Sequence, residues 1–179
     1  MTEPVKDAAR PVRVPRDAEY LAAVEDLLAH PLVRSMEEYT QHGDTSCLRH
    51  CLNVSYLSWL YCKERGWHAG EAARGGLLHD LFLYDWHRHA KETGEYFHGY
   101  THPRRALENA DRLFRLTERE KDIILHHMWP LTVTPPHSRE AYVIVMFDKY
   151  CSLMETFHKP LLQRVATQEW IPSRPAQAQ

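Results

Sequence analysis

Residues 75–86 read GGLLHDLFLYDW. Small and apolar residues lead up to His79 and Asp80, two side chains that are costly to bury. Neighbouring residues on an α-helix point about 100° apart, so such a pair can serve one small target only where the helix ends. The stretch therefore predicts a buried helix that ends at His79-Asp80, with both side chains turned toward one polar site in the core.

The apolar spacing on both sides of this stretch is helical. Asp17 is a typical N-cap before an apolar-periodic segment, Thr117 and Glu120 match a capping box, and Pro103 is expected to start a helix. Glycine is scarce, with 7 of 179 residues, and strand-like alternation is nearly absent. We therefore expect an all-α, single-domain helical bundle, with helices over about 17–30, 31–42, 45–65, 69–82, 103–116, 117–128 and 139–157.

The two ends of the chain differ from this pattern. Residues 1–16 are polar and contain proline, so we expect a flexible N-terminal arm, and residues 171–179 are expected to form a C-terminal tail. The helical domain is then predicted over residues 17–170, with one or two further helical turns over residues 159–169.

Composition limits the kind of protein this is. The formal net charge is -2, so no electrostatic signal favours a nucleic-acid polymer or a membrane surface as partner. No apolar run approaches the roughly 20 residues that span a bilayer, and the N-terminus lacks an apolar signal-peptide core. We therefore expect a cytoplasmic protein. Cys47 and Cys51 lie four residues apart on one helix face, where they could form a soft metal site or remain free buried thiols.

Histidine is unusually frequent, with 13 residues, 7 of them between positions 79 and 127. A lone helical histidine is more often an ordinary core or surface residue. Here, however, such groups recur on the apolar faces of successive segments, where burial is costly unless they pair or bind metal. This recurrence suggests that they converge on one point. The residues are His50, His79, Asp80, His102, His126, His127 and Asp148.

The order His50, His79-Asp80, Asp148 resembles the signature of the HD-domain superfamily of metal-dependent phosphohydrolases, over about residues 45–157. The resemblance implies an all-helical bundle in which these four residues bind a metal ion, with His79 and Asp80 at the catalytic position. Two nitrogen and two oxygen donors suit Mn, Fe, Co, Ni or Zn better than Ca or Mg.

A binuclear subset of the superfamily has two more histidines between the His-Asp pair and the last aspartate. His102 and His126 match them in order, which implies a second ion and Asp80 as the bridge; His127 could replace His126, contact substrate or be solvated. The chain differs from the cyclic-dinucleotide phosphodiesterases of that subset, because Leu83 stands where they have lysine and their Gly-Tyr-Pro segment is absent.

The resemblance favours a phosphohydrolase in which metal-activated water attacks a small phosphoester or nucleotide. Two alternatives remain open: a di-iron, O₂-dependent oxygenase with the same ligands, and a non-catalytic regulatory module with a structural metal. The partner expected is a small anionic substrate, and an oligomer is possible. Its candidate contacts are Arg88 and His98 from the loop over residues 84–101, together with His127 and Lys149.

Overall fold

The computed structural model describes residues 12–83, 98–157 and 167–170. Helices dominate these residues, so the expected all-α, single-domain fold is confirmed. In chain order the elements are β1 (Val12–Pro15), α1 (Ala18–Ala29), α2 (Pro31–Arg34), the 3₁₀ helix η1 (Ser35–Glu38), β2 (Thr40–His42), β3 (Thr45–Ser46), α3 (Cys47–Glu64), α4 (Ala69–Leu78), α6 (His98–Leu113), α7 (Glu118–His126), α8 (Arg139–Thr156) and β4 (Thr167–Trp170). No helix in these ranges is both long and apolar enough to cross a lipid bilayer.

Local capping signals set where the helices begin. The Asp17 carboxylate accepts hydrogen bonds from two backbone N–H groups at the start of α1, as its N-cap position predicts. Thr117 and Glu120 form the expected capping box at the start of α7. The prolines after α7 leave residues 127–138 without a regular helix, as their sequence predicts.

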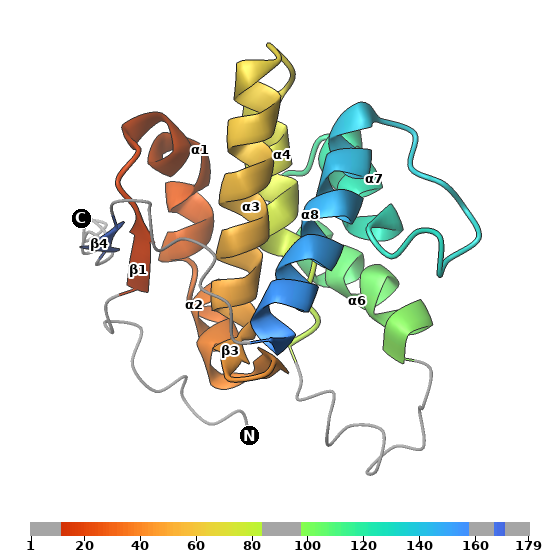
Figure 1. Ribbon diagram of the computed structural model, residues 1–179, viewed down its shortest axis with the longest axis horizontal. Coiled ribbons are helices and arrows are strands. Elements are labelled where there is room, and N and C mark those ends of the chain that lie inside the picture. The colour runs from red at the N-terminus through yellow and green to blue at the C-terminus, as the bar shows by residue number, and fades with distance from the viewer. Residues whose placement is uncertain (1–11, 84–97, 158–166, 171–179) are drawn as a thin grey trace.

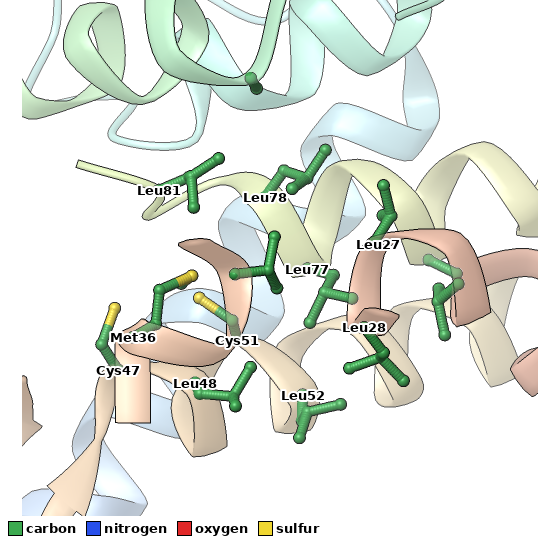
Figure 2. Close-up of a cluster of buried hydrophobic side chains, with 14 of the residues drawn as sticks. Leu27, Leu28, Met36, Cys47, Leu48, Cys51, Leu52, Leu77, Leu78 and Leu81 are labelled. Carbon is green, nitrogen blue, oxygen red and sulfur yellow. The ribbon is translucent and has the colours of Figure 1, made fainter. Parts of the chain in front are cut away.

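The bundle is built around α3 and α4, which lie between α1 and α2 on one side and α7 and α8 on the other (Figure 1). Leucines from α1, α3 and α4 point toward one another in the main hydrophobic core (Figure 2). Gly76 allows close approach at this centre, because a Cβ at that position would lie 2.9 Å from the Ser55 Cα of α3. The tight α3–α4 contact brings the last turn of α4 against the middle of α3.

Three local expectations differ from the structure. Val12–Pro15 forms a strand within the expected arm and pairs antiparallel with Thr167–Trp170, so the helical turns expected over 159–169 are wrong from Thr167 on; residues 158–166 lie outside the described residues. The segment expected as a helix over 31–42 divides into α2, η1 and β2. Helix α6 begins at His98, so Pro103 lies inside it rather than at its start. A proline near a helix start removes only one intrahelical hydrogen bond, so the helix can continue through it.

Candidate metal centre

The recurring histidines and aspartates converge in space, and we call the set below the His/Asp cluster. The members come from α3, the end of α4, α6, the residue after α7, and α8. Each is at most 8 % exposed. They are His50, His79, Asp80, His102, His127 and Asp148.

One half of the His/Asp cluster joins α3, α4 and α8. Asp148 Oδ1 lies 3.2 Å from His50 Nε2 and 3.7 Å from His79 Nε2. Asp80 Oδ2 lies 4.0 Å from His50 Nε2 and 3.5 Å from His79 Nε2. Two imidazole nitrogens and two carboxylate oxygens thus face one another, a donor set that suits a divalent transition metal.

The other half joins Asp80 to α6 and the end of α7. Asp80 Oδ1 lies 3.2 Å from His102 Nε2 and 3.5 Å from His127 Nε2. The two histidine nitrogens are themselves 2.8 Å apart. Asp80 therefore presents one carboxylate oxygen to each histidine pair, which is the geometry a bridging carboxylate requires.

The backbone after α4 explains how His79 and Asp80 reach the same site. Regular helix ends at Leu78, and the turn continues with a hydrogen bond from Phe82 N to Asp80 O of 2.8 Å. Leu83 then takes a positive φ of 59°, which turns the chain away from the helix axis. The helix therefore ends at the His-Asp pair, as the quoted stretch predicts, and four residues before the end near residue 82 that the apolar spacing predicted.

Hydrogen bonds at Nδ1 orient three of the imidazole rings. His79 Nδ1–H donates to Gly76 O at 2.7 Å, and His127 Nδ1–H donates to Ile124 O at 2.8 Å. His50 Nδ1–H donates to the Glu155 carboxylate at 2.8 Å. Each bond turns the Nε2 atom of its ring toward the cluster, the arrangement typical of metal-binding histidines.

Two cluster atoms support a metal more directly. His79 Nε2 and Asp80 Oδ1 are buried and have no hydrogen-bond partner among the described residues. Leaving a buried polar atom unpaired costs about 1–3 kcal/mol. An ion coordinated by these atoms would remove that cost, so the residues present fit a metal.

Charges in the cluster keep both carboxylates ionised. Burial alone would raise the pKa of Asp80, but the charge on His79 and the neighbouring His102 ring hold it below its usual range. Burial likewise opposes ionisation of Asp148, and its hydrogen bond with His50 together with the charge on nearby His79 holds its pKa well below the usual value. Both acids are therefore ready to bind a cation at neutral pH.

The histidines divide into two protonation classes. Burial, together with the charge on His79, lowers the pKa of His127 to about 3. Burial also disfavours charge on His50, yet its hydrogen bonds to Asp148 and Glu155 hold its pKa well above the ordinary value. Without metal, His50 and His79 are held as cations by the carboxylates, and a metal would have to displace their protons.

His126 lies outside the His/Asp cluster. His127 occupies the position in the second half of the cluster that was expected for His126. His126 Nδ1 lies 2.8 Å from Asp122 Oδ1, which also accepts from the ring of His137 at 3.0 Å. The reason is helical periodicity. Ile123 and Ile124 lie on the buried face of α7, and His127 follows them by four and three residues, so it lies on the same face.

The expected substrate contacts are placed only in part. Lys149 is exposed on α8, and its Nζ lies 3.4 Å from the backbone oxygen of His127, beside the cluster. Partial burial lowers the pKa of its ammonium group. His127 lies inside the cluster itself. Arg88 and the side chain of His98 lie outside the described residues.

Sequence reasoning missed several polar neighbours of the cluster. Glu155 accepts from His50 and from the Asn53 side-chain amide, the latter at 2.8 Å, and Gln41 Nε2 donates to Asp80 Oδ2 at 2.5 Å. Glu155 follows Asp148 by seven residues on α8, a spacing that returns to the same helix face and could have identified it. No comparable local signal marks Gln41.

All four cysteines are buried free thiols. Cys47 and Cys51 lie close enough to Asp80 to form a third possible donor group with it. Burial raises the pKa of both thiols, so the neutral form that binds metal poorly is favoured.

Neither the scan of protein-family models nor the searches of curated proteins and of solved structures find a match to this chain.

Proposed function

We propose that this chain is a metal-dependent phosphohydrolase of the HD-domain superfamily, acting on a small phosphoester or nucleotide. Two divalent transition metal ions, iron or manganese with cobalt, nickel or zinc as alternatives, would serve as its cofactors. A cytoplasmic location belongs to the same proposal and agrees with four buried free thiols.

The placement of Asp80 is the observation that carries the proposal. Its two oxygens face different histidine pairs, His50 with His79 and His102 with His127. A structural ion needs one closed set of ligands, whereas a carboxylate shared between two incomplete sets leaves positions open for other ligands. Two-ion sites of this kind clamp both sides of a displacement at phosphorus.

Metal ions bound there would activate water and neutralise charge on phosphoryl oxygens. The chain's own residues would hold the ions and align them: Asp148, His50 and His79 on one side, His102 and His127 on the other. Lys149 stands at the edge of the cluster as a cation for an anionic substrate. Lys149 and the bound ions would make the cluster locally positive, although the formal net charge of the whole chain is -2.

Metal stoichiometry in two neighbouring variants tests the ligand set. His127→Ala should lower the number of Mn²⁺ ions bound per chain from two to about one, because His127 faces Asp80 and His102. His126→Ala should retain two, since His126 faces Asp122 instead. Equal metal content in both variants would remove His127 from the ligand set and contradict the two-site geometry.

Activity of the wild-type protein separates the three functional classes. Release of phosphate from a panel of phosphomonoesters and nucleotides, dependent on added Mn²⁺, Co²⁺ or Ni²⁺, would support the hydrolase. Two irons per chain with O₂ uptake and no phosphate release would instead support the oxygenase. Tight metal binding with neither activity would support a regulatory module. Lys149→Ala should raise KM for an anionic substrate without changing metal content.

A further inference from the structure

Gln41 enters the His/Asp cluster through an irregularity in a short ribbon. In the pairing of β2 with β3, Thr40 lies opposite Ser46 and His42 lies opposite Thr45, so Gln41 is an extra residue. Such a bulge leaves one residue out of the ladder and redirects its side chain. Gln41 is 7 % exposed, whereas Thr40 beside it is exposed.

The redirected side chain meets the residue at the middle of the cluster. Gln41 Nε2 donates to Asp80 Oδ2 at 2.5 Å, and Asp80 Oδ2 is the oxygen that faces His50 and His79. A donor fixed on this oxygen sets the rotation of the carboxylate and so determines where Asp80 Oδ1 points. Asp80 Oδ1 faces the other histidine pair.

The other end of the amide shows that stability alone does not explain this side chain. Gln41 Oε1 is buried and has no hydrogen-bond partner among the described residues. An unpaired buried carbonyl destabilises the fold, and methionine has a similar shape without that polar atom. The amide is therefore accounted for by its contact with Asp80.

We propose that Gln41 is a positioning residue of the metal centre, whose amide N–H holds the Asp80 carboxylate across both histidine pairs. This inference rests on the proposed metal-dependent function. Gln41 acts through Asp80 and is not itself a ligand. Changes to residues that orient metal ligands typically weaken metal binding 10- to 100-fold.

Metal binding to the metal-free protein, residues 1–179, tests this role. Titration calorimetry with Mn²⁺ should show Gln41→Met binding about 10- to 100-fold more weakly than wild type. The melting temperature of metal-free Gln41→Met should stay close to that of wild type, because removal of the unpaired carbonyl offsets loss of the donor to Asp80. Gln41→Glu should also bind more weakly, since it sets a second carboxylate against Asp80. Thr40→Ala, an exposed change on the same strand, should match wild type in both measurements.

Electron paramagnetic resonance adds a readout that a purely structural role would not change. Two Mn²⁺ ions joined by one carboxylate give a spin-coupled spectrum, and Gln41→Met should lose that coupling at saturating Mn²⁺.

Several results would overturn the inference. Unchanged affinity and coupling in Gln41→Met would show that the contact does not orient Asp80. Tighter binding in Gln41→Glu would make the side chain a direct ligand. A lower melting temperature of metal-free Gln41→Met with unchanged metal affinity would assign the amide to the fold alone. Wild-type protein that binds no Mn²⁺ would instead refute the metal centre, a result visible without any variant.

Discussion

Replacing Gly76 by alanine tests the packing that brings the His-Asp pair into the core. The new Cβ would lie 2.9 Å from Ser55 Cα, 3.2 Å from Ser55 N and 3.0 Å from Ile144 Cδ1. Carbon atoms in good contact are about 3.5–4.0 Å apart. The Ile144 side chain can rotate, but the backbone of α3 cannot move without the helix, so α4 must shift away from α3.

The expected cost follows from overpacking against a rigid neighbour. Overpacking typically costs about 1–3 kcal/mol, and contact with backbone places Gly76→Ala in the upper part of that range. Alanine also gains up to about 1 kcal/mol of helix propensity over glycine. We expect a net loss of about 1–2 kcal/mol in the free energy of unfolding relative to wild type.

Gly70→Ala is the matched control, because a Cβ at Gly70 meets nothing within 4 Å and the position lies in the same helix. Both variants gain helix propensity, so the difference between them isolates the steric term. Urea unfolding of the metal-free proteins should place Gly76→Ala about 2–3 kcal/mol below Gly70→Ala. Metal affinity should fall as well, since Gly76 O orients the His79 ring. Equal stability of the two variants would refute the close-approach argument.

Three further predictions concern the surroundings of the cluster. Glu155→Gln should weaken Mn²⁺ binding about 10- to 100-fold, because it removes the charge that orients His50. The exposed control Glu118→Gln should leave Mn²⁺ binding unchanged, and calorimetry measures both variants. Asp122→Asn should lower the free energy of unfolding by about 1–2 kcal/mol without changing metal content, because the carboxylate accepts two backbone N–H groups before α8. Burial opposes ionisation of Asp122, but its hydrogen bond with Ser138 lowers its pKa to about 2. Urea unfolding should therefore show that the contribution of Asp122 to the free energy of unfolding is complete above about pH 4 and lost toward pH 2. Asp122→Asn should show no such change. Calorimetry in buffers of different ionisation enthalpy should detect proton release when metal binds at pH 7, because His50 and His79 must lose their protons; its absence would contradict their charged state.

The helices were predictable because their signals are local. Asp17 caps the helix that begins at the next residue, and Thr117 with Glu120 caps another within four positions. The strand Val12–Pro15 has its partner at the opposite end of the chain, so no window of sequence contains both halves of that ribbon. Its side chains alternate over too few residues to identify a strand alone.

The candidate site divides in the same way. Residue type and apolar context identified all six members of the His/Asp cluster, five of them as metal ligands. The choice between His126 and His127 needed only the spacing from Ile123 and Ile124. Gln41 could not be predicted from the sequence, because its position depends on how β2 pairs with β3. A bulge is a property of two strands together, and nothing within one of them specifies it.

The protonation of the cluster connects its geometry to the kind of ligand it would take. Without metal, the cations on His50 and His79 balance the carboxylates of Asp80 and Asp148, and His127 adds no charge. Exchange of two protons for two divalent ions makes the site more positive by two charges. Because the cluster is buried, that charge is poorly screened by solvent. An anion is the ligand that best compensates it, which is why metal loading and affinity for a small phosphoester should rise together.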